Sequence, residues 1–193
     1  MEDVWSGRTP LVWSLPDGTF TPTVEALPCG ILSGAFDPLH AGHRQLQQAA
    51  GEWLGQPVLF ELTLRNADKR HLDHLTVTRR RQQFENQPVG LSVAATFAEK
   101  SQLLAGCTFV VGIDTAVRIV DRRFYGNCDD QMERALEQIQ RADCRFLVAG
   151  RASESGFLTR RNLQVPSGFA ELFEELPEAS FREDISSSEL RSE

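Results

Sequence analysis

Short apolar runs alternate along the chain with segments in which apolar residues recur every three or four positions. A short apolar run is typical of a buried strand, and a spacing of i, i+3, i+4, i+7 is typical of a helix packed on one face. The runs predict strands at residues 29–33, 58–64, 91–94, 108–111 and 145–149, with a sixth near residues 179–182. The periodic segments predict helices at residues 43–54, 77–84, 97–104, 115–120 and 130–141.

This order of strands and helices predicts the α/β fold class. Strands that alternate with helices pair in parallel, and the helices then cover the sheet. We therefore expect a Rossmann-like, doubly wound parallel sheet of five or six strands with helices on both faces. Ligands of such sheets bind at the carboxyl ends of the strands.

Two segments fall outside this alternation. Residues 11–22 predict a small hairpin around the turn Pro16-Asp17-Gly18. We therefore divide the chain into an N-terminal appendage, residues 1–26, and a single domain, residues 27–193. Residues 151–166 are polar and predict an irregular loop, which is a candidate cover for the site.

Charge and cysteine content narrow the function classes. The 193 residues carry a net charge of −7, which argues against a protein that coats nucleic acid or an anionic membrane. The four cysteines form no C-x-x-C pair, and Cys29 and Cys107 adjoin apolar runs, which favours small core residues. The acidic first residues contain no long apolar stretch, so we expect no signal peptide and a cytoplasmic protein. The oligomeric state stays open.

The segment Gly34-Ala35-Phe36-Asp37-Pro38-Leu39-His40-Ala41-Gly42-His43 joins the first predicted strand to the first predicted helix. A strand, a glycine turn and a helix start aim backbone N–H groups and the positive end of the helix dipole at an anion. His40 and His43, three residues apart, lie on one face of the helix start. Gly42 leaves space for a phosphate to approach the backbone. The sequence therefore predicts a phosphate-binding site at this turn.

The same segment resembles the H-x-G-H signature of the nucleotidylyltransferase superfamily. Near the other end of the chain, Ile185-Ser186-Ser187-Ser188-Glu189-Leu190-Arg191 resembles that superfamily's I-S-S-T-x-I-R motif, with serine in the threonine place and leucine in the isoleucine place. Class I aminoacyl-tRNA synthetases carry an element similar to H-x-G-H, but they are far longer, and this chain has no K-M-S-K-S run.

A third segment is similar to one branch of the superfamily. Asn66-Ala67-Asp68-Lys69 resembles the N-V-D-K-P segment of bacterial proteins similar to nicotinamide mononucleotide adenylyltransferase, with Ala67 and Arg70 as departures. Gly112-Ile113-Asp114 resembles the G-x-D element, and Arg151 resembles an arginine that lines the nucleotide pocket.

The resemblance implies transfer of a nucleoside monophosphate, AMP from ATP in this branch, to a phosphorylated small-molecule acceptor such as nicotinamide mononucleotide, with release of pyrophosphate. A phosphate monoester has its second pKa at about 6, so the nucleophile is already ionised and needs no general base. Mg²⁺ would bridge the triphosphate oxygens with few or no direct protein ligands. A cytidylyltransferase using CTP and a nucleotide-binding module without turnover are the alternatives.

The resemblance also assigns roles residue by residue. The implied catalytic residues are His40, His43 and Arg191. The implied nucleotide-binding residues are Gly34, Ala35, Phe36, Gly112, Asp114, Arg151, Ser186, Ser187 and Ser188. The implied acceptor-binding residues are Asn66 and Lys69. No metal ligand is assigned.

Ordinary structural roles compete with these assignments. A histidine pair at a helix start can be satisfied by backbone or solvent, and Asp114 and the C-terminal serines are good helix caps. Asp37 is more typical of a turn or capping residue than of a ligand.

Two polar clusters are interpreted as structural. His71, Asp73 and His74 predict a polar connection rather than a metal site. The run Arg79-Arg80-Arg81 covers three directions of a helix, which is typical of a solvated face, although one of the three could touch a substrate phosphate.

Overall fold

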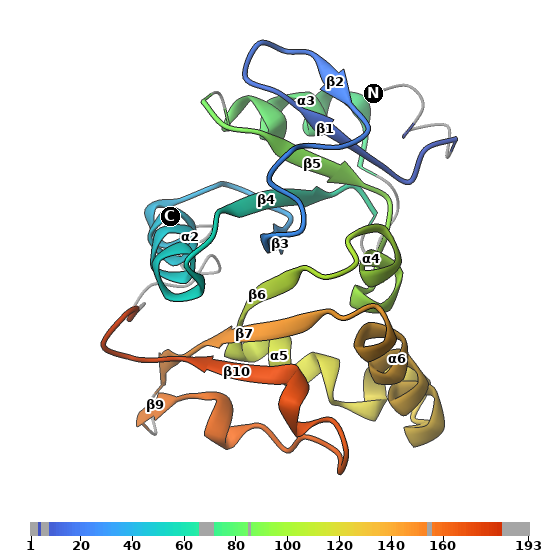
Figure 1. The fold of residues 1–193 in the computed structure, drawn as a ribbon, viewed down its shortest axis with the longest axis vertical. Helices are drawn as coiled ribbons and strands as arrows, with labels where there is room; N and C mark the ends of the chain where they lie inside the picture. The colour runs from blue at the N-terminus through green and yellow to red at the C-terminus, as the bar shows by residue number, and fades with distance from the viewer. Residues whose placement is uncertain (1–3, 5–7, 66–71, 85, 154–155, 183–193) are drawn as a thin grey trace.

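The computed structural model describes residues 4, 8–65, 72–84, 86–153 and 156–182. Within these residues, eight strands form one mixed sheet in the order β10-β7-β6-β3-β4-β5-β1-β2 (Figure 1). Six neighbouring strands of the sheet run parallel. They are β3 (Gly30–Gly34), β4 (Val58–Thr63), β5 (Val89–Ser92), β6 (Thr108–Gly112), β7 (Arg145–Ala149) and β10 (Phe173–Leu176). The predicted α/β class is confirmed.

The five central strands form close to where the apolar runs predict them, but the sixth prediction is wrong. Residues 179–182 contain no strand, and β10 lies a few residues earlier. In β10, Phe173 and Leu176 are buried while Glu174 is exposed. Two acidic residues in a four-residue edge strand leave no apolar run to find, because one side of such a strand faces solvent.

Five helices of the described chain cover both faces of the sheet, as predicted. They are α2 (Ala41–Leu54), α3 (His74–Gln82), α4 (Phe97–Leu103), α5 (Ile113–Ile119) and α6 (Asp129–Arg141). Side chains of α2 and α3 pack into one buried cluster, and side chains of α5 and α6 pack into the cluster on the other face. In Figure 1, α2 lies on one side of the sheet and α4 and α6 lie on the other.

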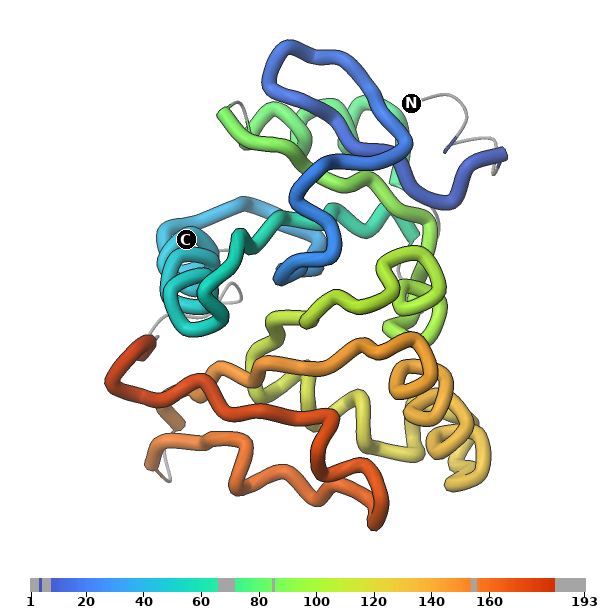
Figure 2. Tube along the Cα trace, viewed as in Figure 1, coloured from blue at the N-terminus to red at the C-terminus, as the bar shows by residue number. Residues whose placement is uncertain are grey.

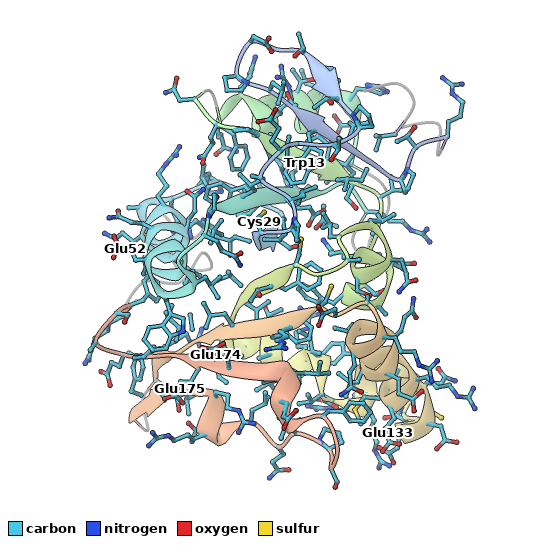
Figure 3. All side chains as sticks on the ribbon, viewed as in Figure 1. Trp13, Cys29, Glu52, Glu133, Glu174 and Glu175 are labelled. Carbon is cyan, nitrogen blue, oxygen red and sulfur yellow. The ribbon has the colours of Figure 1, made fainter. Side chains whose placement is uncertain are left out.

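The N-terminal segment forms a hairpin that joins the main sheet. Strand β1 (Leu11–Ser14) pairs antiparallel with β2 (Phe20–Thr21) and, on its other side, antiparallel with β5. Trp13 of β1 is fully buried between the sheet and its helices, and Figure 3 labels it together with Cys29. Figure 2 shows the hairpin beside the chain of β5 and α3, at the opposite end of the molecule from β10. The division at residue 26 stays a prediction.

The expectation of an irregular loop at residues 151–166 is wrong in part. Strands β8 (Arg151–Ser153) and β9 (Gly156–Leu158) form a two-stranded antiparallel sheet. A Cβ on Gly150 would lie 2.5 Å from the Phe157 ring, so the hairpin folds closely back over the end of β7. Strands of three residues are too short to show an alternating pattern.

Three cysteines lie one position before neighbouring parallel strands: Cys29 before β3, Cys107 before β6 and Cys144 before β7. All three are buried and free, which confirms the expectation for Cys29 and Cys107. No helix of the described residues is both long and apolar enough to cross a membrane.

Candidate active site

The two central strands end side by side at the point where the chain changes direction across the sheet. From β3 the chain proceeds to β4 and β5 on one side, then returns to β6 on the other side of β3. Open α/β sheets bind ligands at such a switch point, outside the carboxyl ends of the strands. Strand β3 ends at Gly34, before the histidine segment, and β6 ends at Gly112.

His40 and His43 come together at the start of α2. His40 takes the N-cap position with extended backbone (φ −128°, ψ 174°), and His43 lies in the first turn of the helix. Their ring centroids are 3.7 Å apart, with the planes inclined by 33°. The backbone N–H of His43 donates to the His40 carbonyl at 3.1 Å. The predicted pair of imidazoles on one helix start is therefore formed.

The surroundings of the pair determine the state of each ring. The backbone N–H of His40 donates to Nδ1 of His43 at 3.3 Å, so the neutral His43 ring carries its proton on Nε2. Burial, and secondarily the charge of His40, lowers the pKa of His43 to about 4. Burial also lowers the pKa of His40. His43 is therefore neutral at pH 7 and has one N–H donor available on Nε2.

The ring of Phe36 packs against the ring of His43. Phe36 is 3% exposed, and its ring meets the His43 ring edge-on at 5.1 Å between centroids. It also packs edge-on against Phe60 and Phe84. A Cβ on Gly34 would lie 3.0 Å from the Phe36 ring, so glycine is what allows the ring to fold back under the turn. The Phe36 side chain therefore lies in the core rather than at the surface of the predicted site.

Arg80 corrects the expectation of a solvated arginine run. Its side chain is buried, with the whole residue 8% exposed. Nη1 donates to the Ala35 carbonyl at 2.9 Å, and Nη2 forms an ion pair with the Asp37 carboxylate. Arg80 lies three residues after the buried Val77 and four before the buried Phe84, so the helical period places it on the buried face. This spacing from two apolar residues could have predicted from the sequence that Arg80 is buried.

The segment Gly112-Ile113-Asp114 and Arg151, both predicted to bind the nucleotide, also lie together. Gly112 occupies the N-cap position of α5, so the capping role considered for Asp114 is wrong, and Asp114 lies in the first helical turn. Arg151, at the start of β8, forms an ion pair with Asp114 at 2.7 Å between Nη1 and Oδ2. A Cβ on Gly112 would meet no atom within 4 Å, so the space above this helix start is open. Two residues predicted for one role, 37 positions apart, are thus in contact.

The remaining predicted site residues lie outside the described part of the chain. These are Asn66 and Lys69 of the acceptor segment and Ser186, Ser187, Ser188 and Arg191 of the C-terminal motif. The backbone N–H of Leu72 donates to the Leu64 carbonyl at 3.0 Å. Leu64 and Leu72, which flank the predicted acceptor segment, therefore lie side by side at the carboxyl end of β4.

Asp73 has a structural role. It caps α3 by accepting hydrogen bonds from the Thr76 backbone N–H and hydroxyl, both at 2.8 Å. His71 is outside the described residues. Among those that are described, no three His, Cys, Asp or Glu side chains lie close enough together to hold a metal ion.

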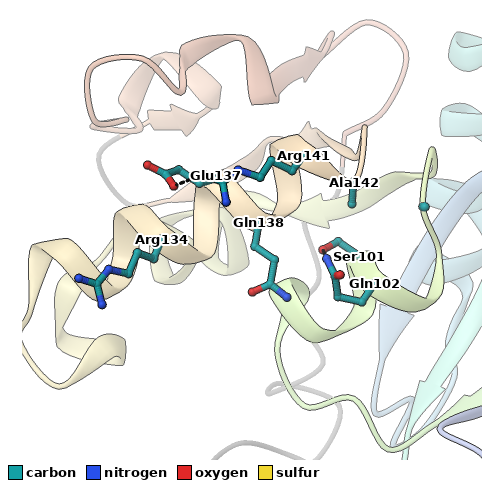
Figure 4. Close-up of a pocket in the computed structure, with 8 residues that line it drawn as sticks. Ser101, Gln102, Arg134, Glu137, Gln138, Arg141 and Ala142 are labelled. Atoms are coloured by element: carbon teal, nitrogen blue, oxygen red, sulfur yellow. Dashed lines mark hydrogen bonds and ion pairs between the residues drawn. The ribbon is translucent and has the colours of Figure 1, made fainter.

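A groove of about 470 Å³ lies between α4 and α6, away from the histidine pair (Figure 4). Its lining includes the ion pair of Arg141 with Glu137, 3.0 Å apart, and the side chain of Gln138, which donates to the Ala98 carbonyl. These are ordinary polar contacts between two helices, and none of the predicted site residues lies there.

Two sets of polar contacts near the carboxyl ends of the strands were not predicted from the sequence. Lys100 of α4 forms an ion pair with Glu61 of β4 and donates to the Thr63 hydroxyl at 2.7 Å. Gln83, at the end of α3, contacts the histidine segment itself. Neither belongs to a motif, and both act through contacts between distant parts of the chain.

A family model described as cytidylyltransferase-like matches residues 31–193. The matched region contains the histidine pair, the motif at the end of β6 and the C-terminal serines. No curated protein matches the chain.

Proposed function

The chain belongs to the cytidylyltransferase-like family of nucleotidylyltransferases, and from this premise we propose that it transfers AMP from ATP to a phosphate monoester such as nicotinamide mononucleotide. Pyrophosphate is the second product. The observation that carries the proposal is the neutral imidazole pair at the start of α2, beside the switch point of the sheet.

The two histidines stabilise charge that develops on the α-phosphate. With Nδ1 of His43 occupied by the His40 backbone N–H, Nε2–H is the donor directed at the substrate. The start of α2 adds backbone N–H groups and the positive end of the helix dipole. Donors fixed in this way stabilise a transition state more than a ground state, because they do not have to reorganise as charge accumulates.

The acceptor attacks without help from a base. Its phosphate monoester is already ionised near pH 7, with a second pKa of about 6. The protein then supplies position and charge neutralisation, as in phosphoryl transfer generally. Asn66 and Lys69 are proposed to hold the acceptor phosphate, and Ser186, Ser187, Ser188 and Arg191 to hold the β- and γ-phosphates.

Asp114 and Arg151 are proposed to form the nucleoside side of the site. Their contact at 2.7 Å brings a carboxylate and a guanidinium to the open end of β6. The carboxylate is suited to accept from ribose hydroxyls, and the planar guanidinium can lie against a base or a phosphate. Gly112 leaves the room that a bound nucleoside requires.

Magnesium is proposed to travel with the triphosphate. The ion retains waters and binds proteins through one or two carboxylates together with substrate phosphates. The carboxylates of the two motifs, Asp37 and Asp114, each face an arginine. This donor set fits an ion held mainly by phosphate oxygens, where it neutralises charge on the triphosphate.

A cytidylyltransferase is the second candidate, and the matched family description favours it. Calorimetric titration of ATP, CTP and GTP in the presence of Mg²⁺ separates the two. We expect ATP to bind most tightly, and GTP to bind about 5- to 150-fold more weakly, because its O6 accepts where adenine donates and leaves buried groups unpaired. CTP binding at least tenfold tighter than ATP would overturn the adenylyl assignment in favour of the cytidylyl one.

Product analysis tests the acceptor. ATP, Mg²⁺ and nicotinamide mononucleotide should yield the dinucleotide and pyrophosphate in equal amounts. Formation of an adenylylated acceptor and pyrophosphate from ATP with another phosphate monoester, and none with nicotinamide mononucleotide, would retain the reaction and reject this acceptor.

A further inference from the structure

The turn at residues 36–40 connects β3 to the histidine pair and needs support from elsewhere. Phe36 has a left-handed backbone conformation (φ 45°), which is uncommon for a residue with a side chain. Between Gly34 and Ala41 the backbone forms neither helix nor strand and makes a turn at Asp37 and Pro38. Its shape therefore depends on contacts with other elements.

Gln83 bridges the two ends of this turn. Its side-chain Nε2 donates to the Phe36 carbonyl at 3.1 Å, and its Oε1 accepts from the Leu39 backbone N–H at 2.8 Å. A single primary amide has one acceptor and two N–H donors on adjacent atoms, so it can satisfy both backbone groups at once. His40 follows Leu39 in the chain. Its backbone N–H donates to Nδ1 of His43 and so fixes the orientation of that ring.

Gln83 is itself held in place. Arg44 of α2 donates from Nη2 to the Gln83 carbonyl at 2.9 Å, and Gln83 Nε2 also approaches the Arg80 carbonyl at 3.2 Å. One helical turn earlier, Arg80 contacts Ala35 and Asp37. The end of α3 thus touches Ala35, Phe36, Asp37 and Leu39, four of the five residues that lead up to His40.

We propose that Gln83 is a positioning residue for nucleotidyl transfer, which holds the turn at residues 36–40 so that His43 presents Nε2–H to the substrate. The inference rests on the proposed function. Gln83 touches the backbone of the turn and not the imidazole rings, and it acts through the Leu39 and His40 peptides. Displacements of about 1 Å in such a frame can reduce turnover about 100-fold.

The test compares Gln83→Met with a matched control, Gln47→Met. Methionine has a similar length and removes both hydrogen bonds from the Gln83 side chain to the turn. Gln47 is also partly buried and donates at 2.7 Å to the Val58 carbonyl and at 2.8 Å to Gln87, away from the turn. Gln83→Glu retains the acceptor for Leu39 and loses the donor for Phe36.

We expect Gln83→Met to lower kcat at least tenfold with KM for the triphosphate changed less than threefold. The kcat of Gln83→Glu should lie between those of wild type and Gln83→Met. Gln47→Met should keep the wild-type kcat even if its melting temperature falls as far as that of Gln83→Met. Equal kcat for the Gln83→Met and Gln47→Met variants, or a loss carried by KM alone, would overturn the inference.

A second readout does not require activity. Long-range ¹H–¹⁵N NMR spectra of the histidine rings report which nitrogen of His43 carries the proton. The wild-type protein and Gln47→Met should show the Nε2–H tautomer, and Gln83→Met should show a mixture with Nδ1–H. An unchanged His43 spectrum in Gln83→Met would overturn the inference. An inactive wild-type protein would instead overturn the proposed function, and the spectra would still decide whether Gln83 holds the histidine pair.

Discussion

The protonation of one imidazole links the local structure to the chemistry. His43 is surrounded by Phe36 and the ring of His40, and it receives a backbone N–H on Nδ1. These contacts keep the ring neutral at pH 7 and leave Nε2–H as a fixed donor. The surrounding ring faces and backbone thus define both the charge and the tautomer of the group.

His43→Ala should lower kcat with little change in triphosphate affinity, because the donor acts mainly where charge develops. The loss of one such donor costs about 2.7–4 kcal/mol of transition-state stabilisation, or roughly 100- to 1000-fold in kcat. Steady-state kinetics and calorimetry on the same samples measure the two effects. His74→Ala, which removes an exposed imidazole, is the control. Wild-type kcat in a folded His43→Ala variant would remove His43 from the mechanism.

The pKa of His43 also predicts how stability depends on pH. Folding lowers this pKa from its usual 6.5 to about 4, so between these values the unfolded chain binds the proton more readily than the folded protein. The stabilisation associated with neutral His43 is complete above about pH 6.5 and is lost as the pH falls toward 4. The free energy of unfolding, measured by denaturation at a series of pH values, should therefore fall less between pH 6.5 and pH 4 in His43→Ala than in wild type. Parallel curves for the two proteins would contradict the buried, neutral state of the ring.

At the level of elements, an ion pair joins β4 to α4 beneath the edge of the sheet that carries the site. Glu61 is 0% exposed and Lys100 is 3% exposed. Removing two charges from water is costly, and the cost is offset only while each retains its partner. The Thr63 hydroxyl provides a further contact to the ammonium group.

Lys100→Met should destabilise the protein by about 3–5 kcal/mol, because Glu61 is left buried without its partner. The double variant Glu61→Leu/Lys100→Met should recover most of this loss, since both charges are gone. Arg141→Met, at an exposed pair on α6, should cost less than about 1 kcal/mol. Chemical denaturation provides the three values. A double variant as unstable as Lys100→Met would show that the pair itself, and not the stranded charge, stabilises the junction.

The elements that could be predicted are those whose pattern of apolar residues follows directly from how they are buried. The central strands are apolar runs because helices cover them on both sides, and α6 shows its buried stripe of Met132, Leu136 and Ile139 plainly. Strand β10 and the β8–β9 hairpin were missed because strands of three or four residues are too short to show a clear run or alternation of apolar residues.

The candidate site could be predicted only where a motif is local. His40 and His43 are three residues apart, so predicting the start of one helix was enough to predict that their rings lie together. The support from Gln83 spans 44 and 47 positions to Leu39 and Phe36, and no periodicity encodes such a contact. The contact between Asp114 and Arg151 was not predicted. The resemblance assigned each residue separately to the nucleotide, and the pairing of β6 with β7 brings the two together.

At the scale of the whole molecule, the N-terminal hairpin extends the sheet beyond its parallel part. Strand β1 covers the edge of β5 that would otherwise expose a row of unpaired backbone groups. Its alternate residues face both sides, with Trp13 in one buried cluster and Val12 in the other. The sequence indicated the turn but not the edge of the sheet to which the hairpin would attach.

Trp13→Ala should cost about 3–5 kcal/mol of unfolding free energy, the range for truncating a buried aromatic side chain. Trp53 of α2 is the matched control. Trp53 is 45% exposed and donates to Glu174 at 2.8 Å, so Trp53→Ala should cost about 1 kcal/mol. Urea denaturation compares the two variants. Equal losses would mean that the hairpin is not part of the cooperative fold.

The central claim is that this protein catalyses nucleotidyl transfer through the histidine pair at the end of β3. The most direct measurement is pyrophosphate release with Mg²⁺, the four nucleoside triphosphates and a panel of phosphate monoesters that includes nicotinamide mononucleotide, in wild type and His43→Ala. We predict acceptor-dependent release in wild type, fastest with ATP, and at least a 100-fold lower rate in the variant. No acceptor-dependent release from any triphosphate, or equal rates in the two proteins, would contradict the account.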